Sequence, residues 1–121
     1  MKLRLVVITI LGVLAWSLYA RSARTMSFEA TAYAIDGITA SGIRSQPGTV
    51  AADTDILPLG TRIRITYPGG AAANYLVADT GEHIQGRRID IFVPNKAAAK
   101  RFGRRMVRVT VLKWGPREKA E

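Results

Sequence analysis

Six short runs with the composition of β-strands recur along this chain, and glycine or proline separates most of them. Alternation is clear in two of the runs. Ile63 and Ile65 alternate with arginines, and Val107, Val109 and Val111 occupy every second position, as in a strand with one buried face. The six runs are 28–34, 49–52, 62–66, 75–79, 88–93 and 105–113.

Only one segment, residues 95–103, has the pattern of a helix. Asn95 is a suitable N-cap, alanines fill the middle, and Gly103 is a suitable stop. Six strands and one short helix predict an all-β (mainly β) domain. A small closed six-stranded barrel is the expected form, because closure removes exposed strand edges.

The N-terminal segment differs from the rest because residues 5–20 carry no charge. Basic residues flank this run, and its length lies between that of a signal-peptide core and that of a membrane-spanning helix. Its uniform apolarity argues against an amphipathic core helix. We therefore expect an apolar helix in 1–23, acting as a cleaved signal peptide or a retained membrane anchor. A barrel domain in 24–114 and a disordered tail in 115–121 would follow. The expected location is the cell envelope, in the periplasm or outside the cytoplasmic membrane.

The composition excludes several classes of site. The chain has no cysteine and one histidine, His83, so it has no disulfide framework, thiolate site or multi-histidine metal site. We expect no cofactor and no metal. The formal net charge is +9, which attracts an exported domain to anionic envelope polymers. Nucleic acid is not an expected partner, because the N-terminal segment argues against a cytoplasmic location.

Three of the nine acidic residues end short apolar runs. Asp79 and Asp90 lie on either side of a turn that contains Gly81 and Gly86, so their side chains could face one groove. Asp53 closes a third run. This arrangement suits chemistry on a polar substrate. The simpler interpretation of each aspartate is a turn or strand-end residue that accepts hydrogen bonds from nearby backbone.

Five motifs in fixed order resemble the three-aspartate (3D) domain, the catalytic part of membrane-bound lytic transglycosylase A and of related muralytic cell-wall proteins. The motifs are ATAY (30–33), TASG (39–42), GTVAAD (48–53), LPLGT (57–61) and DTGEHIQGRRID (79–90). The resemblance implies a double-psi β-barrel with an open groove. Glu82 and His83 depart from the usual small residues of the turn, and Thr54 stands where proline is common.

The resemblance also implies a function. A lytic transglycosylase cleaves the MurNAc–GlcNAc β-1,4 bond of peptidoglycan and leaves a 1,6-anhydro end, with one carboxyl serving as both acid and base. Crowding of carboxyls in a groove would raise the pKa of at least one of them. The implied catalytic residues are Asp90 as acid/base, Asp79 and Asp53. Candidate substrate-binding residues are Tyr33, Thr39, Ser41, Thr80, Gly81 and Arg88. The expected partner is a peptidoglycan glycan strand, and the protein is expected to be a monomer.

Two other interpretations remain at this point. The domain could be a non-catalytic barrel that binds glycan or loosens the wall. The tripeptide Asp79-Thr80-Gly81 also occurs in aspartic proteases, where two copies meet across a dimer axis. The protease interpretation leaves Asp53 and Asp90 without a role.

Overall fold

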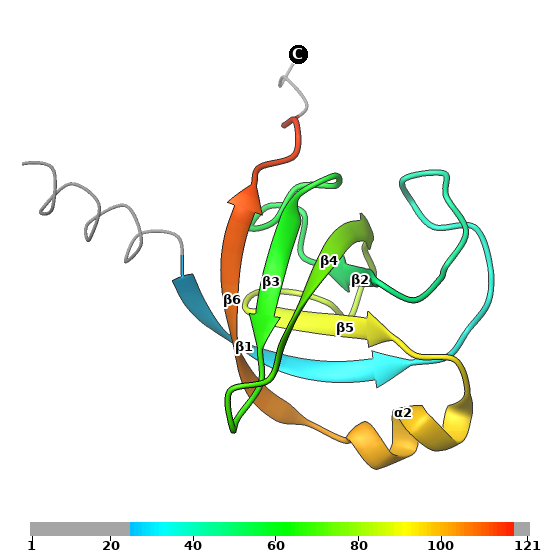
Figure 1. The fold of residues 1–121 in the computed structure, drawn as a ribbon. Coiled ribbons are helices and arrows are strands. Elements are labelled where there is room, and N and C mark those ends of the chain that lie inside the picture. Colours follow the sequence, from blue (N-terminus) through cyan, green and yellow to red (C-terminus); the bar gives the residue numbers. More distant parts are fainter. Residues whose placement is uncertain (1–24, 118–121) are drawn as a thin grey trace, which may run out of the picture.

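The computed structural model describes residues 25–117, which form a mainly β domain with six strands and one short helix, as the sequence predicts (Figure 1). No helix in this part of the chain is long and apolar enough to cross a membrane. The apolar helix expected before residue 24 lies outside the described residues. The elements are β1 (Thr25–Tyr33), β2 (Thr49–Ala52), β3 (Arg62–Thr66), β4 (Ala72–Asp79), β5 (Arg88–Phe92), α2 (Lys96–Phe102) and β6 (Arg105–Lys113).

The six strands close on themselves in the order β1-β5-β2-β4-β3-β6. The β1/β5 and β2/β4 pairs are parallel, and the other neighbouring pairs are antiparallel. Figure 1 shows β1 and β5 running side by side in the same direction. The pairing of β5 with β2 joins the two parallel pairs into one stretch of sheet, β1-β5-β2-β4. Strands that are distant in sequence therefore lie side by side there.

Burial follows the local sequence of each strand. In β3 and β6 only every second residue is buried, because these strands have one face in the core and one in water. All four residues of β2 are buried. Its short apolar run, Thr49-Val50-Ala51-Ala52, suits a strand that lies between β5 and β4 with both faces covered.

The helix α2 connects β5 to β6 and has the predicted ends. The Asn95 side chain accepts a hydrogen bond from the Ala98 N–H at 2.8 Å, and this bond satisfies one of the free donors of the first turn. Gly103 has φ of 62° and donates its N–H to the Ala99 carbonyl, which ends the helix.

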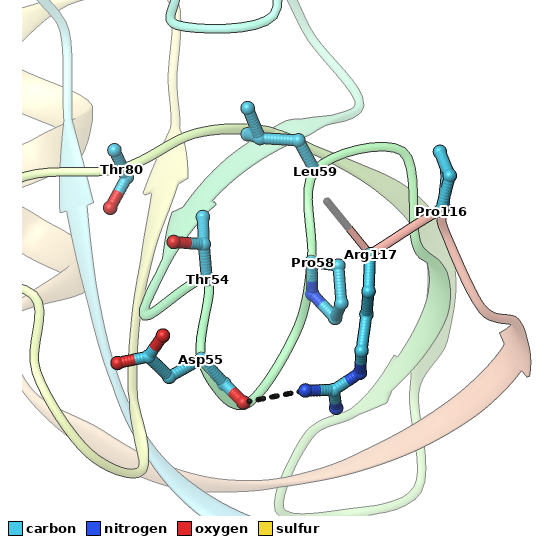
Figure 2. A pocket seen from close by; sticks show the side chains of 7 residues that line it. All are labelled: Thr54, Asp55, Pro58, Leu59, Thr80, Pro116 and Arg117. Atoms are coloured by element: carbon cyan, nitrogen blue, oxygen red, sulfur yellow. Dashed lines mark hydrogen bonds between the residues drawn. The ribbon is translucent and has the colours of Figure 1, made fainter. Parts of the chain in front are cut away.

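The chain after β6 turns back onto the barrel. Gly115 is buried, and its N–H donates to Thr61 Oγ1 at 2.9 Å. A Cβ at position 115 would overlap the Leu59 carbonyl oxygen. Beyond it, Arg117 Nη1 donates to the Asp55 carbonyl oxygen at 3.4 Å (Figure 2). Residues 115–117 therefore contact the domain, although the sequence places them in a disordered tail. Glycine at 115 permits this close approach, and its partner on the β2–β3 connection is not visible in local sequence.

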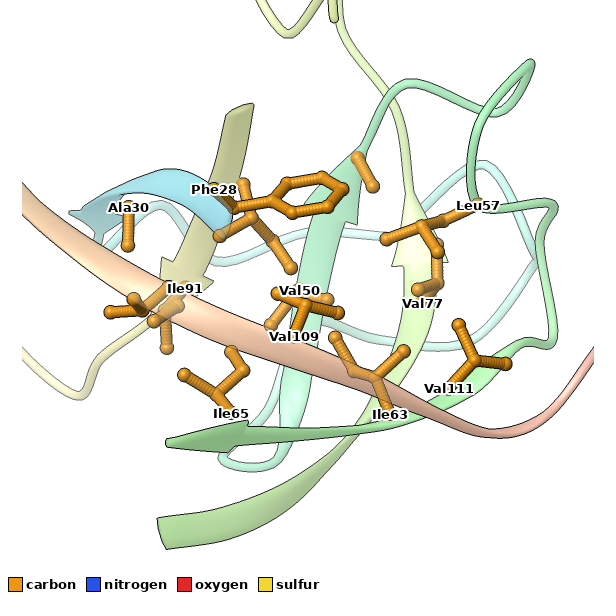
Figure 3. Packing of buried hydrophobic residues seen from close by; sticks show 13 residues of the cluster. Phe28, Ala30, Val50, Leu57, Ile63, Ile65, Val77, Ile91, Val109 and Val111 are labelled. Atoms are coloured by element: carbon orange, nitrogen blue, oxygen red, sulfur yellow. The ribbon is translucent and has the colours of Figure 1, made fainter. Parts of the chain in front are cut away.

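The core fills the barrel interior with side chains from every strand and from the β2–β3 connection (Figure 3). The largest apolar members are fully buried, and this burial is the main stabilising contribution to the fold. They are Phe28, Leu57, Ile63, Ile65, Ile89, Val50, Val77, Val109 and Val111.

Candidate active site

A cleft of about 350 Å³ opens where β1, β2, β4 and β5 meet the loops that follow them. Both Asp79 and Asp90 line it, and so does Tyr33 from the end of β1. Thr80 and Gly81 form another part of its wall. The structure thus brings together two of the three candidate catalytic residues and three of the candidate substrate-binding residues.

The pairing register explains why the two carboxylates meet. Asp90 on β5 is aligned with Thr31 on β1 and with Ala51 on β2, and Ala51 is aligned with Asp79 on β4. Aligned residues on neighbouring strands project from the same face of a sheet. Thr31, Asp90, Ala51 and Asp79 therefore form a row across four strands. We call it the cross-strand row. The small side chain of Ala51 leaves room between the two carboxyls.

Asp90 is held on the cleft side of β5 because its neighbours Ile89 and Ile91 are buried in the core. The Thr31 hydroxyl donates a hydrogen bond to Asp90 Oδ1 at 3.0 Å. Burial of the carboxyl raises the pKa of Asp90, while the Thr31 hydrogen bond and the positive charge of Arg88 act in the opposite direction. Asp90 therefore binds its proton more firmly than an ordinary aspartate does.

Asp79 is bound differently, through backbone amides. Its Oδ1 accepts hydrogen bonds from the N–H of Ala40 at 3.0 Å and from the N–H of Thr80 at 2.9 Å. The first of these bonds joins the end of β4 to the loop between β1 and β2. Asp79 therefore shapes the cleft wall as well as facing the cleft.

Asp53, the third candidate catalytic residue, does not line the cleft. Its Oδ1 accepts from the Asp55 N–H at 3.0 Å and its Oδ2 from the Gly86 N–H at 2.8 Å. Gly86 has φ of 71°, a conformation that favours glycine. Asp53 thus ties the β2–β3 connection to the turn between Asp79 and Asp90. Asp53 thus holds two loops in place, as in the simpler interpretation of an aspartate that accepts hydrogen bonds from nearby backbone.

Tyr33 lines the cleft, and its hydroxyl is buried. That hydroxyl has no hydrogen-bond partner within residues 25–117. Burial raises the pKa of Tyr33, and the negative charges of Asp79 and Asp90 add to the rise; the nearby Ser45 hydroxyl works against it without reaching hydrogen-bonding geometry. The ring is fixed by an edge-to-face contact with Phe92 at 5.8 Å between centroids. The rigid ring therefore forms a fixed part of the cleft wall.

Three other candidate substrate-binding residues lie outside the cleft lining. Thr39 is buried, and its hydroxyl donates to the Ile43 carbonyl at 2.7 Å and lies 2.9 Å from the Ser41 hydroxyl. The Ser41 N–H donates to the Ala78 carbonyl. Arg88 donates to the His83 carbonyl at 3.3 Å and lies 3.7 Å from Glu29. All three hold loops in place, because their polar groups are already engaged in the fold.

The loop between β1 and β2 supplies cleft residues that the sequence analysis did not select. Ile35 and Ile38 line the cleft with 74% and 68% of their surface exposed. Asp36 also lines it and pairs with Arg44 at 2.9 Å. These residues belong to no periodic run, so their only sequence signal was two isoleucines in a segment otherwise rich in turn residues.

A second cavity of about 500 Å³ adjoins the first, and Thr80 lines both. Figure 2 shows its walls, with Thr54 and Asp55 on one side and Pro116 and Arg117 on the other. It is larger than the cleft but contains neither Asp79 nor Asp90. The candidate active site is therefore the smaller cleft that contains the two carboxyls.

The polar groups of the cleft are suited to proton transfer. Among residues 25–117, no group of three or more histidine, cysteine, aspartate or glutamate side chains is placed to hold a metal ion. The cleft offers one partly desolvated carboxyl with a raised pKa, a second carboxyl that accepts backbone N–H groups, and an aromatic ring. A carboxyl in such surroundings can serve as a general acid or base.

Comparison with known proteins places the chain in a family. The sequence model of the 3D domain matches residues 48–113. The cell wall-binding protein YocH of Bacillus subtilis is 37% identical over 100 residues, which cover 75% of this chain and 33% of YocH. The chain thus spans about a third of that relative.

Solved structures agree on the fold. The structure of E. coli MltA with bound chitohexaose has a TM-score of 0.57 and 26% identity, covering 68% of this chain and 29% of MltA. The Streptomyces papain inhibitor has a TM-score of 0.58 at 18% identity, covering 74% of this chain and 94% of that one. The second likeness concerns the fold alone. The match of the family model to more than half of the sequence shows that this chain belongs to the 3D domain family.

Proposed function

We propose that this protein is a peptidoglycan lytic transglycosylase in which Asp90 is the general acid and base. The observation that carries the proposal is the half-buried Asp90 carboxyl, with its raised pKa, in a cleft shared with Asp79. The likeness to E. coli MltA, whose structure contains chitohexaose, supports a β-1,4-linked amino-sugar chain as the ligand of the cleft.

The proposed reaction uses one carboxyl twice. Protonated Asp90 donates its proton to the glycosidic oxygen, and the bond from that oxygen to C1 of the MurNAc residue breaks. The C6 hydroxyl of the same sugar attacks C1, and Asp90 takes the hydroxyl proton. The products are a GlcNAc end and a 1,6-anhydro-MurNAc end, and Asp90 is protonated again. The nucleophile belongs to the substrate, so the reaction needs neither a bound water nor a metal to activate one.

The other cleft residues take supporting roles in this proposal. Asp79 uses Oδ1 to accept two backbone N–H groups, and its other oxygen would accept a sugar hydroxyl. The Tyr33 ring, which lines the cleft, would pack against the sugar beside Thr80 and Gly81. Asp53, Thr39, Ser41 and Arg88 act as positioning residues, since their polar groups hold the surrounding loops.

The proposal extends to fold type and location. We assign the barrel to the double-psi type, supported by its closed six-strand order and its two parallel pairs. The cell wall-binding relative and the likeness to MltA support a site of action outside the cytoplasm, on peptidoglycan. A monomer is sufficient for the chemistry, because one chain supplies every group used.

A second candidate function is glycan binding without cleavage. The relative YocH is described as a cell wall-binding protein. Two of the three family aspartates accept backbone N–H groups here, which a binding module would also need. The raised pKa of Asp90 in a cleft shared with Asp79 favours the enzyme, because a general acid needs a carboxyl that binds its proton more firmly than usual.

Replacing Asp90 by asparagine separates the two functions. Asp90→Asn preserves size and most hydrogen bonds but removes the transferable proton, so the release of muropeptides from purified sacculi should slow at least about 100-fold. Mass spectrometry of the soluble products should find 1,6-anhydro ends from the unmodified protein. Glu82→Gln removes a carboxylate from the exposed rim of the same cleft and should cleave at close to the normal rate.

Each failure has a distinct meaning. Reducing ends in place of 1,6-anhydro ends would indicate a hydrolase that positions a water molecule. Equal rates for Asp90→Asn and the unmodified protein would remove Asp90 from the chemistry. If the unmodified protein binds sacculi and releases nothing, the binding module is the better description.

A further inference from the structure

The cavity beside the active-site cleft has the features of a second ligand site. We call it the C-terminal cavity, because residues 115–117 close one of its sides. Its volume is about 500 Å³, and Thr54, Asp55, Pro58, Leu59 and Thr80 complete its walls together with Pro116 and Arg117 (Figure 2). Thr80 also lines the cleft that holds Asp90. A branched ligand could therefore occupy both spaces at once.

The wall of this cavity is fixed by specific contacts. Gly115 is held by its hydrogen bond to Thr61 and lies so close to Leu59 that no side chain would fit there. Pro116 packs toward Gly60. On the opposite side, Asp53 accepts the Asp55 N–H and so fixes the loop that carries Thr54 and Asp55. The cavity thus has two ordered sides.

Charge in the cavity is uncommitted. The Arg117 guanidinium makes one long hydrogen bond, to the Asp55 carbonyl at 3.4 Å. Neither Arg117 nor the Asp55 carboxylate has an ion-pair partner within residues 25–117. One cation and one anion that lack an ion-pair partner among residues 25–117 suit a single carboxylate on a mixed-charge ligand better than a polyanion, which the Asp55 charge would repel.

Peptidoglycan differs from a plain amino-sugar chain by the short peptide attached to MurNAc. That peptide is joined through the lactyl ether at C3 of the sugar whose C1 is the site of cleavage. Its attachment point is therefore no more than one sugar ring away from the atoms that Asp90 would protonate. It bears carboxylates and an amine along a short flexible chain, and such a chain can cross Thr80 into the neighbouring cavity.

We infer that the C-terminal cavity binds the peptide stem of peptidoglycan, with Arg117 pairing with a stem carboxylate. This inference rests on the proposed function, since it requires MurNAc in the Asp90 cleft. It makes the protein selective for stem-bearing strands over stripped glycan. Arg117 is a specificity-determining residue in this arrangement and takes no part in bond cleavage.

The test compares binding to two immobilised polymers, glycan strands with their stems and the same strands after enzymatic removal of the stems. The chain carries Asp90→Asn throughout, so that strands are not cut during the measurement. This protein should bind stem-bearing strands about fivefold more tightly, as expected for a partly exposed charge-assisted contact. Adding Arg117→Gln should abolish the preference and leave the affinity for stripped strands unchanged.

Arg101→Gln is the matched control, because it removes the same charge from an exposed position on α2 outside the C-terminal cavity. It should keep the full preference. The inference is overturned if the starting protein binds both polymers equally, if Arg117→Gln retains the preference, or if Arg117→Gln weakens binding to both polymers equally. Cleavage by the chain with intact Asp90 is measured separately. Its absence would contradict the proposed reaction and leave the binding comparison valid.

Discussion

At the scale of single residues, the cleft separates aspartates that look alike in sequence. Asp90 sits between two core isoleucines and accepts one hydroxyl hydrogen bond. Asp79 and Asp53 accept hydrogen bonds from backbone N–H groups of neighbouring loops. The proposed reaction therefore gives proton transfer to Asp90 and the fixing of loop geometry to Asp79 and Asp53.

The Thr31 hydrogen bond to Asp90 gives a prediction about pH. An acid must carry its proton, so the cleavage rate should fall as pH rises through the pKa of Asp90, which burial places above the ordinary value of 3.8. The Thr31 hydroxyl stabilises the ionised carboxylate. Thr31→Val removes that stabilisation, so the pKa should rise further and the alkaline limb of the kcat profile should move to higher pH.

Thr25→Val is the control for this experiment. Thr25 lies at the other end of the same strand, where its hydroxyl contacts that of Thr110 at 3.2 Å. Its replacement should leave the pH profile in place. A profile for Thr31→Val that moves to lower pH, or does not move, would show that the measured limb does not belong to Asp90.

At the scale of elements, the position of the site depends on how the strands are aligned, because the cross-strand row takes its members from different strands. The strands β1, β5, β2 and β4 each contribute one member, so no local segment contains the site. The register of β2 against β4 shifts between Val50 and Ala51. This irregularity brings Ala51 level with Asp79, and bulges of this kind commonly re-aim side chains next to active sites.

Ala51 gives a steric prediction. Its methyl group lies between the two aspartate-bearing strands, and a larger side chain there would fill the floor of the cleft. Ala51→Val should cost about 1–3 kcal/mol of unfolding free energy as overpacking, and chitohexaose binding should fall well beyond what that loss explains. Urea unfolding and calorimetric titration measure the two effects.

Ala73→Val adds the same atoms on β4 at an exposed position. Binding should be unchanged in this variant, and stability should change little, because valine suits a strand. If Ala51→Val binds chitohexaose normally, the ligand does not approach the cross-strand row, and the cleft assignment fails.

Local sequence predicted some elements better than others. The bounds of β2, β3 and β6 match the expected runs because apolar composition or alternation defines them. β1 begins at Thr25, three residues before the expected start, because Thr25 is aligned with Thr110 on β6. β4 begins at Ala72 because Ala72 is aligned with Thr66 on β3. Both extensions depend on a partner strand that composition does not reveal.

The same limit applies to the site. The motifs and their resemblance to a family identified the residues that meet in the cleft, Asp79 and Asp90. They did not indicate that Asp53 would bridge two loops, because Gly86 is 33 positions away in sequence. They also missed Ala51, which strand pairing aligns with the two aspartates. The isoleucines of the β1–β2 loop were missed as well, because that loop is held by tertiary hydrogen bonds such as that from the Ala40 N–H to Asp79.

At the scale of the whole molecule, the chain is a small positive body with a net charge of +9. The helix α2 contributes Lys100 and Arg101 in its last turn, and Arg104 and Arg105 follow it. Of these four residues, only Arg104 forms an ion pair within the described residues, with Glu29. Long-range attraction to an anionic wall polymer would raise the local concentration of protein at its substrate.

This attraction should depend on salt. The screening length falls from about 10 Å at 0.1 M to about 3 Å at 1 M ionic strength, so binding to anionic cell-wall preparations should weaken several-fold over that range. Binding to uncharged chitohexaose should not change, because its contacts are local. Sedimentation with wall material and calorimetry with chitohexaose provide the two measurements. Wall binding that is insensitive to salt would exclude net charge as a contributor.

The order of strands in the barrel also determines when the protein can fold. The first strand, β1, has β5 and β6 as its neighbours, and both belong to the last third of the domain. While the chain is being synthesised, β1 therefore has no native partner until most of the domain has been made. The barrel closes only when β6 pairs with β1 and β3, so closure must wait until the chain has been synthesised as far as β6. Pairing between such distant segments carries a large loop-closure entropy and is intrinsically slow. A nascent chain of this kind therefore lacks its closed barrel, and the cleft built across four strands, for most of its synthesis.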